Sequence, residues 1–396
     1  MSKLAVDGGQ PVRTKAFPEW PIYGELEERL LLEVLHSGKW GGTGRVKLEE
    51  LEQKFAAYQD AKYAVTVVNG TVGISVALQA AGVQPGDEVI MPPYTFIATA
   101  SAALLFGAIP VFVDIEPDTL LLDPERVEAA ITPRTKAIIA VHIAGAPCRL
   151  DRLKEIAAKH NIRLIEDAAQ AVGAQWNGTG VGAIGDLGTF SFQSSKNLNS
   201  GEGGMILTND QALADMAWSI ANVGRVRGGA WYQHEHIGWN YRMTEFQAAI
   251  LLGQMTRLDE QVARRERNGL LLTEMLGQID GIVPLQRAPE ITRHAYHLYM
   301  FKLAPEVADR LDKNDVIAKL SAEGIPTSYG YVPLNKNEAV LSEIRKWTGE
   351  DRTFSCPVSE RASDKEVIWL TQNMLLGDES DLEDIANAVR KVMASY

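Results

Sequence analysis

The stretch FSFQSSKNLNSGEGGMILTND, residues 190–210, holds a lysine in an unusual setting. An alternating apolar run leads into Ser-Ser-Lys, a glycine-rich segment follows at once, and a second apolar run begins after it. A surface lysine needs no such neighbours, whereas a lysine whose amine enters a tight pocket needs backbone that permits close approach. Ser191 and Ser195 add hydroxyls beside Lys196, and the glycines of 201–204 keep space open. The pattern therefore indicates a lysine with a chemical role on a turn between two strands.

Short apolar segments with the same character recur through the first part of the chain, with helical stretches between several of them. The predicted strands are YAVTVV (63–68), DEVIMPP (87–93), IPVFVDI (109–115), TKAIIAVH (135–142), IRLIED (162–167), LGTFSFQ (187–193) and GMILTND (204–210). Near-continuous apolar strands that alternate with helices predict an α/β fold, in which helices cover both faces of a mostly parallel, seven-stranded sheet.

The rest of the chain extends this plan at both ends. Residues 23–58 are predicted to form two helices joined by a glycine-rich loop, and a long helical region follows Thr244. Beyond it, a strand and two amphipathic helices predict a smaller α+β unit. We therefore expect a large domain of residues 1–255 and a small C-terminal domain of residues 256–396.

Composition narrows the class of protein. The chain has 396 residues, of which 46% are hydrophobic and 23% charged, as in ordinary globular proteins. A net charge of −12 argues against a general nucleic-acid binder. No run of about 18 apolar residues and no signal-peptide core is seen, so that neither a membrane partner nor export is expected and a cytoplasmic location is predicted. Cys148 and Cys356 offer neither a disulfide framework nor a metal-binding spacing.

Two further strand ends carry candidate binding residues. Gly70 and Thr71 begin a helix whose free N–H groups would attract a phosphate, although a simple turn in which Thr71 caps the helix is the alternative. After the next strand, Tyr94 and Phe96 lie where ligands bind in open α/β sheets. An aromatic ring there could stack on a planar cofactor or could be ordinary core.

The strand IRLIED ends in the carboxylates Glu166 and Asp167. Burying a carboxylate is costly unless a cation or donor meets it, and a protonated ring nitrogen would be such a partner. Capping of a following helix by Asp167 is the alternative. Lys196 would need partial desolvation to form a Schiff base, whereas a lone lysine after a strand usually faces solvent. Together the four strand ends provide a phosphate cradle, a stacking ring, a ring-nitrogen acid and a Schiff-base lysine, which is the set that pyridoxal 5′-phosphate requires.

The chain resembles a fold-type I pyridoxal-phosphate enzyme of the DegT/DnrJ/EryC1/StrS family, the sugar and aminocyclitol aminotransferases. The resemblance covers nearly the whole chain and is specific in FSFQSSKNL…GEGG, EDAAQA, PPYTF and GWNYRMTEFQAA. It implies that Lys196 carries the Schiff base, that Asp167 pairs with the pyridine nitrogen and that Phe96 stacks on the ring. The remaining implied cofactor contacts are Gly70, Thr71 and Ser191 at the phosphate and Gln170 near the ring hydroxyl.

The resemblance also implies a reaction and an assembly. The reaction would move an amino group from glutamate or glutamine, through pyridoxamine phosphate, to a cyclic keto sugar or keto-cyclitol in amino-sugar, aminocyclitol or related secondary-metabolite biosynthesis. Family members are typically homodimers with shared sites, and Asn240 would reach the neighbouring subunit's cofactor phosphate. In YGYVPLNKN, Tyr331 and Asn335 are expected on the substrate side, where many relatives have His or Tyr in place of Asn335. Arg242 is a candidate for the donor carboxylate, or a structural residue.

Three alternatives to this reaction stay open. A keto-sugar dehydratase is disfavoured because relatives with that activity replace the lysine with histidine, and this chain keeps Lys196. A reaction like that of 3-amino-5-hydroxybenzoate synthase is compatible with FPEWP near the start and CPVSERAS near the end. A non-catalytic regulator that binds the cofactor would need a DNA-binding segment or a damaged site, and neither is evident.

Overall fold

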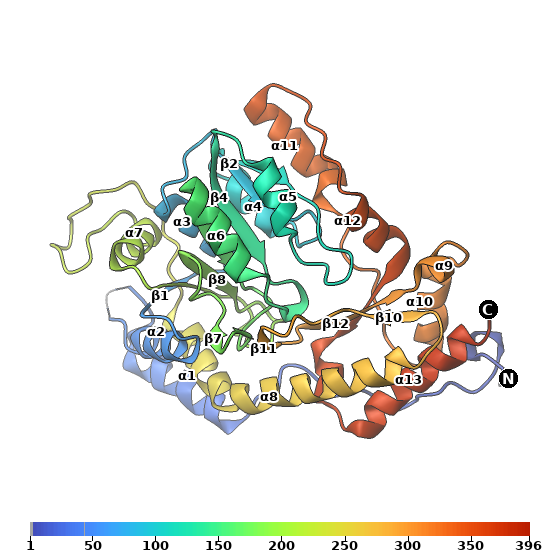
Figure 1. The fold of residues 1–396 in the computed structure, drawn as a ribbon. Coiled ribbons are helices and arrows are strands. Elements are labelled where there is room, and N and C mark those ends of the chain that lie inside the picture. Colours follow the sequence, from blue (N-terminus) through green and yellow to red (C-terminus); the bar gives the residue numbers. More distant parts are fainter. Residues whose placement is uncertain (1–2, 43) are drawn as a thin grey trace.

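The computed structural model describes residues 3–42 and 44–396 and shows a central sheet between layers of helices (Figure 1). The sheet has seven strands in the order β1-β9-β8-β5-β4-β2-β3. Their bounds are β1 (Tyr63–Val67), β2 (Glu88–Met91), β3 (Ile109–Phe112), β4 (Thr135–Val141), β5 (Arg163–Asp167), β8 (Leu187–Ser191) and β9 (Gly204–Thr208). β9 is antiparallel to both of its neighbours and the other pairs are parallel. The predicted α/β fold with a mostly parallel, seven-stranded sheet is confirmed.

Each face of this sheet is covered by its own set of helices. The first set is α3 (Gly70–Ala80), α4 (Ala98–Leu104) and α7 (Gln211–Ala221), and the second is α2 (Lys47–Tyr58), α5 (Pro124–Ala130), α6 (Leu150–His160) and the first half of α8 (Glu245–Gly277). Because side chains alternate along a strand, Ile139 of β4 joins the core under the first set and Ile138 joins the core under the second. Burial of both faces explains why these strands are apolar along their whole length.

A smaller unit follows along the 33-residue helix α8, which crosses the lower edge of Figure 1. It contains an antiparallel sheet of β10 (Ile282–Pro284), β12 (Leu298–Leu303) and β13 (Val367–Thr371), with α9 (Pro305–Ala308), α10 (Lys313–Ala322) and α13 (Glu379–Met393). The other elements are α1 (Glu25–Ser37), α11 (Glu338–Thr348), α12 (Pro357–Arg361), β6 (Gln175–Trp176), β7 (Thr179–Gly180) and β11 (Ile291–Arg293). The expected boundary at residue 255 falls inside α8 and stays a prediction.

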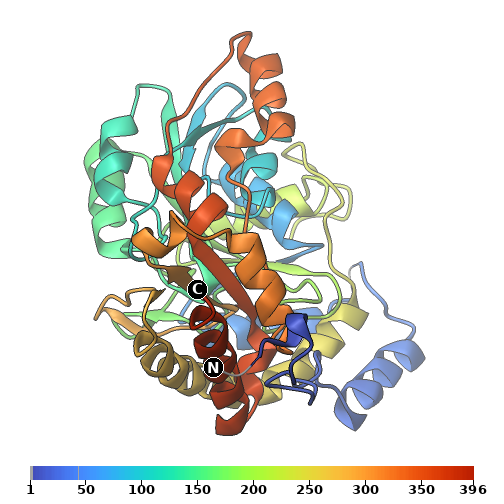
Figure 2. The ribbon, with the colours of Figure 1, turned by 90° about the vertical axis from the view of Figure 1, so that its right-hand side faces the viewer.

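The N-terminal segment packs against this C-terminal unit, so that the two chain ends lie side by side in both ribbon views (Figures 1 and 2). Leu4 belongs to the core of the smaller unit. The carboxylate of Glu323 accepts hydrogen bonds from the backbone N–H groups of Ala5 at 2.8 Å and Val12 at 3.0 Å. Arg13 is buried and forms a 2.8 Å ion pair with Asp381 of α13. The first residues therefore pack with the C-terminal unit, although the predicted range 1–255 groups them with the large domain.

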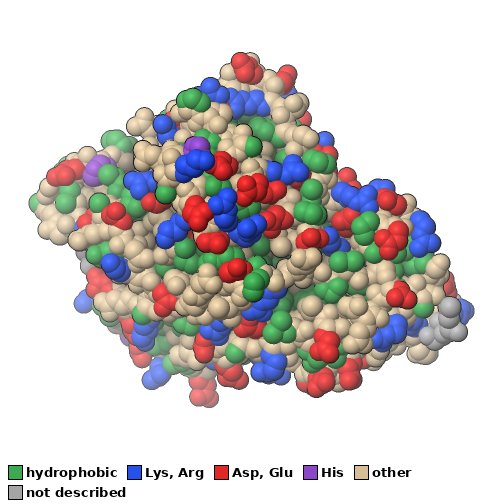
Figure 3. Space-filling model, viewed as in Figure 1, with side chains coloured by type: hydrophobic (Ala, Val, Ile, Leu, Met, Phe, Trp, Pro, Cys, Tyr) green, Lys and Arg blue, Asp and Glu red, His purple; other side chains and the backbone are tan. Residues whose placement is uncertain are grey.

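The surface over α5 and α6 carries both signs of charge in close alternation (Figure 3). Arg152 pairs there with Glu125 at 3.1 Å, and Lys159 pairs with Glu128 at 2.6 Å. Such exposed pairs contribute little to stability, and on this face they leave no broad patch of one sign. Among the described residues, no helix combines the length and the hydropathy that crossing a membrane requires.

Candidate active site

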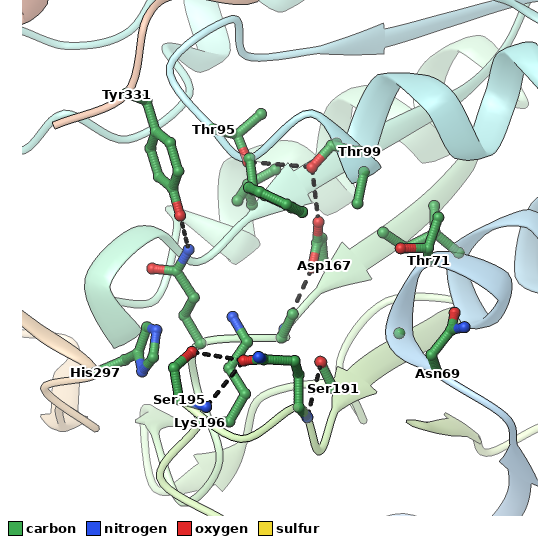
Figure 4. A pocket seen from close by; sticks show the side chains of 18 of the residues that line it. Asn69, Thr71, Thr95, Thr99, Asp167, Ser191, Ser195, Lys196, His297 and Tyr331 are labelled. Carbon is green, nitrogen blue, oxygen red and sulfur yellow. Dashed lines mark hydrogen bonds between the residues drawn. The ribbon is translucent and has the colours of Figure 1, made fainter. Parts of the chain in front are cut away.

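One cavity of about 610 Å³ lies at the carboxyl edge of the large sheet, beyond the ends of β1, β2, β5 and β8. This is the edge at which open α/β sheets bind ligands. Eight predicted residues line it: Gly70, Thr71, Phe96, Asp167, Gln170, Ser191, Lys196 and Tyr331. Asn69 and Thr71 lie at one end of the cavity and Tyr331 and His297 at the other, with Asp167 and Lys196 between them (Figure 4).

The first end of the cavity is the N-terminus of α3. Asn69 is the N-cap, and its side-chain oxygen accepts a 2.9 Å hydrogen bond from the Val72 N–H. The alternative in which Thr71 caps this helix is therefore wrong, and the Thr71 side chain is left free to line the cavity. The first N–H groups of a helix have no intrahelical acceptor and carry a positive partial charge, so that this end suits an anion.

Close packing between α3 and β8 explains the glycines around this end. A Cβ on Gly70 would lie 2.7 Å from the Cβ of Ser191, which real side chains do not tolerate. Val67 of β1 and Ser191 of β8 both pair with Gly204 of β9, so that the ends of β1 and β8 flank this glycine on its two sides. A Cβ on Gly204 would in turn lie 2.5 Å from the Asn69 carbonyl oxygen. The glycine that follows the lysine turn thus permits the close approach that shapes the cradle.

Asp167 ends β5 and lies in the middle of the cavity, 5% exposed. Its Oδ2 accepts a 2.9 Å hydrogen bond from the Thr99 hydroxyl, and its Oδ1 accepts one of 3.2 Å from the Ala169 N–H. Thr99 is itself bonded to Thr95 at 3.1 Å. Burial raises the pKa of Asp167, and these two donors and Lys196 oppose the shift. Turns, not a helix, follow Asp167, so that its expected alternative role as a helix cap is excluded.

Lys196 lies on the turn between β8 and β9. The Lys196 N–H donates to the Gln193 carbonyl at 2.9 Å, and the Ser195 hydroxyl donates to the Gln193 side-chain oxygen at 2.7 Å. Gly201 closes the turn with a φ of +83°, a conformation that glycine adopts without strain. Burial lowers the pKa of Lys196 to about 8, although Asp167 opposes this shift. A neutral, nucleophilic amine is therefore accessible near neutral pH.

The opposite end of the cavity is built around Gln170 and Tyr331. The Gln170 oxygen accepts a 2.7 Å hydrogen bond from the Ala144 N–H, and its amide N–H donates to the Tyr331 hydroxyl at 3.0 Å. Burial raises the pKa of Tyr331 to about 12, so that its hydroxyl keeps its proton. Phe96 is 56% exposed at the rim, with its ring centroid 6.3 Å from that of Tyr331.

His297 lies in this end of the cavity and was not anticipated from the sequence. The Asn197 amide nitrogen donates to the Ala295 carbonyl at 2.8 Å, which leaves the Asn197 oxygen to face His297 Nδ1 at 3.2 Å. Nδ1 must then carry a proton, and Nε2 presents a lone pair. Burial and the Lys196 charge hold the pKa of His297 well below its usual range, so that this ring is neutral. The one feature of the sequence that marks His297 is its position as a polar residue immediately before the buried strand β12.

Three expected residues lie elsewhere. Asn335 is 5% exposed and donates hydrogen bonds to the Phe354 carbonyl at 3.1 Å and to Glu360 at 2.8 Å, so that the expectation of a place on the pocket wall is wrong. Arg242 lines a separate, much smaller cavity, and burial lowers its pKa. Asn240 is exposed and also lies outside the cavity of its own chain.

The cavity therefore combines an anion-binding helix end, a buried carboxylate and an amine with a lowered pKa. The sequence profile of the DegT/DnrJ/EryC1/StrS aminotransferase family matches residues 21–390. The chain belongs to this family and is an aminotransferase.

Relatives are similar along nearly the whole chain. The L-glutamine:2-deoxy-scyllo-inosose aminotransferase of Streptoalloteichus tenebrarius is 41% identical over 99% of this chain and 98% of that protein. The 3-amino-5-hydroxybenzoate synthase of Amycolatopsis mediterranei is 36% identical over 96% of this chain and 97% of that protein. A crystal structure of a 3-amino-5-hydroxybenzoic acid synthase matches with a TM-score of 0.88 and 35% identity, covering 97% of this chain and 100% of that one. These likenesses confirm the fold-type I architecture.

Proposed function

We propose that the protein uses pyridoxal 5′-phosphate to transfer an amino group from glutamine to a keto-cyclitol. The observation that carries the proposal is that Lys196 and Asp167 line one cavity with the N-terminus of α3 at its end. A phosphate fits the helix end, where a Cβ on Gly70 would fill the cradle. Asp167 is buried without a cationic partner close enough for an ion pair among the described residues, and a protonated pyridine nitrogen would provide one.

Each of the side chains in the cavity would have a separate role in the reaction. Bound pyridoxal phosphate supplies an electron-withdrawing ring that stabilises negative charge on the substrate carbon. Asp167 would hold the proton on the ring nitrogen, and its own pKa would fall beside that positive charge. Lys196 Nζ, with a pKa of about 8, can both accept and donate a proton near neutral pH. Gln170 would orient the far edge of the ring, with Phe96 over its face.

The choice of substrates rests on the relatives and on the charge of the cavity wall. The Streptoalloteichus tenebrarius relative is named for glutamine as donor and 2-deoxy-scyllo-inosose as acceptor. Apart from Lys196, the described residues on the wall include no lysine or arginine. One chain therefore offers no side-chain cation for the diphosphate of a nucleotide-linked sugar, which supports an uncharged polyhydroxy ring. The 3-amino-5-hydroxybenzoate synthase reaction is the second candidate, since that relative is almost as similar.

A homodimer with shared sites is part of the proposal. The segment between α7 and α8 projects from the body of the chain at the left of Figure 1. It exposes Trp231, Tyr232, Ile237 and Trp239, each with at least 56% of its surface accessible. Monomeric proteins rarely expose so many large apolar side chains together, so that a partner surface is expected here. Asn240, on the same segment, would then reach the neighbouring chain's phosphate.

The proposal is tested by absorbance and product analysis of the purified protein. We expect pyridoxal phosphate to be bound covalently at Lys196, glutamine to convert its absorbance to that of the amine form, and 2-deoxy-scyllo-inosose to restore it with formation of an amino-cyclitol. Lys196→Ala should abolish all three. Cofactor absorbance that glutamine and glutamate leave unchanged would indicate the non-catalytic regulator instead.

Shared sites are tested with a mixed dimer that carries both Asn240→Ala and Lys196→Ala on one chain and neither substitution on the other. Its one lysine-bearing site pairs with the altered Asn240 if sites are shared. That site should then bind cofactor more weakly by about 1.5–3 kcal/mol, the range for a hydrogen bond to a charged group. Binding as tight as in the unaltered protein would contradict sharing through Asn240.

A further inference from the structure

The N-terminal segment FPEWP, residues 17–21, reaches the lysine turn from outside the cavity. Trp20 is half-buried, and its indole N–H donates a 3.2 Å hydrogen bond to the carbonyl oxygen of Lys196. The Lys196 N–H is held on the other side by the Gln193 carbonyl at 2.9 Å. Both peptide groups that flank the Lys196 Cα are thus fixed, and only side-chain torsions remain free.

The same carbonyl belongs to the peptide group that leads into Asn197. Asn197 is the residue that sets the tautomer of His297 through its side-chain oxygen. A rotation of this one peptide plane would therefore move both Lys196 and the partner of His297. The Lys196 carbonyl also accepts a longer hydrogen bond from the Asn199 amide at 3.4 Å, so that Trp20 provides the shorter of its two donors.

A buried cation supports the indole ring. Arg265 of α8 is 0% exposed, and its guanidinium carbon lies 5.0 Å from the centroid of the Trp20 ring. Its Nε and Nη2 both donate to the Gln372 side-chain oxygen, at 2.9 and 2.6 Å. Among the described residues, the Nη1 of Arg265 has no hydrogen-bond acceptor and no carboxylate forms an ion pair with this guanidinium. A charge buried with so little compensation is costly, and a cation–π contact with Trp20 offsets part of that cost.

The segment is also tied to the small unit one residue beyond Gln372. The Asn373 amide donates a 2.7 Å hydrogen bond to the Pro18 carbonyl. Trp20 is therefore held from two directions, by Arg265 at its ring and by Asn373 through the backbone two residues before it.

We propose that Trp20 is a positioning residue for Lys196, and that Arg265 holds the indole so that its N–H fixes the carbonyl of the lysine. The bond sets the direction in which the amine enters the cavity. Trp20 does not line the cavity, so that it would act on Lys196 without contacting substrate or cofactor. This inference rests on the proposed function, in which Lys196 binds the cofactor covalently.

The test compares Trp20→Phe with Trp40→Phe. Phenylalanine keeps an aromatic ring beside Arg265 but removes the N–H. Trp40 is a matched control, because its indole also donates to a backbone carbonyl, that of Leu35, at 3.2 Å. The first measurement is the rate at which added pyridoxal phosphate becomes covalently attached to Lys196 in cofactor-free protein, followed by the mass of the Lys196 peptide after borohydride reduction.

We expect Trp20→Phe to slow attachment about five- to ten-fold, the effect of one neutral hydrogen bond on a rate. The kcat should fall by a similar factor with the KM for glutamine within about two-fold, since the lysine and not the donor site is displaced. Unfolding midpoints of the two variants should agree. A Trp20→Phe variant that attaches cofactor as fast as Trp40→Phe would overturn the proposal.

Arg265→Met provides a second variant, because an apolar side chain of similar length can replace a poorly compensated buried ion without loss of fold. It should slow attachment to the same degree, and the double variant with Trp20→Phe should be no slower than the slower single variant. Additive losses would separate Arg265 from Trp20 and overturn that part of the proposal. If the unaltered protein attaches no cofactor at Lys196, the proposed function itself fails; equal rates for the two tryptophan variants refute this inference alone.

Discussion

Gly70→Ala isolates the phosphate cradle from the rest of the site. The φ of Gly70 does not require glycine, and alanine is well tolerated in helices, so that backbone strain plays no part. The difficulty is space: the new Cβ would lie 2.7 Å from the Ser191 Cβ and 3.2 Å from its Cα. α3 and β8 must separate by roughly 0.7 Å to reach ordinary contact at 3.4 Å. The N–H groups that would face the phosphate move with them.

The size of the effect follows from these distances. Overpacking a well-filled contact costs about 1–3 kcal/mol of unfolding free energy. A phosphate that loses one hydrogen bond at the displaced helix end should bind about 1.5–3 kcal/mol more weakly, a roughly 10- to 150-fold increase in the cofactor Kd. Gly70→Ala should therefore lower both the unfolding free energy of the cofactor-free protein and the affinity of the protein for the cofactor.

Gly73→Ala is the matched control on the same helix. Its Cβ would meet Val67 Cγ2 at 3.5 Å and Thr189 Cβ at 3.8 Å, which is ordinary contact. Alanine in a helix interior should stabilise the protein by about 0.5–1 kcal/mol with no change in cofactor affinity. Urea unfolding of cofactor-free protein and equilibrium dialysis of pyridoxal phosphate measure the two quantities. If Gly70→Ala binds the cofactor as tightly as Gly73→Ala, the phosphate does not lie against Gly70 and the proposed orientation of the cofactor is refuted.

Asp167→Asn should lower kcat about 100-fold or more while it shifts the melting temperature little, because an amide cannot keep a ring nitrogen protonated; a large melting shift with intact kcat would assign Asp167 a structural role only. Lys196→Met should stabilise the cofactor-free protein by up to about 2–3 kcal/mol below pH 8. The folded-state pKa of Lys196, about 8, lies below the ordinary 10.5, so that below pH 8 folding must bury a charged amine in the unaltered protein but not in the variant. That advantage should vanish as the pH rises through 8 to 10.5 in chemical denaturation, and a difference that persists at higher pH would contradict the pKa assignment. Tyr331→Phe removes the acceptor of the Gln170 amide and should lower the unfolding free energy by about 0.5–1.5 kcal/mol. It should also raise the KM for the ketone, and an unchanged KM would argue against a place for Tyr331 on the substrate side.

The sheet was predictable because its strands are buried on both faces and therefore apolar throughout. The lysine turn and the end of β5 could be found for the same reason, since polar residues at the ends of such strands stand out. Asn335 shows the limit of this reasoning. Its segment does bring Tyr331 into the cavity, but a 3₁₀ turn at Leu334–Lys336 directs Asn335 to Glu360, a partner 25 residues away that no local pattern reveals.

Thr99 and His297 were missed for a related reason. Thr99 is the second residue of α4, the helix that follows β2, and its importance comes from Asp167 at the end of β5, with β4 between β2 and β5 in the sheet. His297 precedes a strand of the small unit, and its tautomer depends on Asn197 from the large one. Such roles arise from contacts between distant segments, and spacing along the chain carries no record of them.

The docking of the N-terminal segment on the C-terminal unit has a consequence for the order of events during synthesis. Ala5 and Val12 are synthesised 318 and 311 residues before their partner Glu323, and Arg13 is likewise made long before its partner Asp381. The N-terminal segment therefore has no binding surface while the large sheet is made, and the small unit can complete its packing only after α13 has been synthesised. A bulky fusion at the N-terminus, or removal of the first residues, would therefore disturb the latest step of folding and leave the Glu323 carboxylate to be buried with fewer donors.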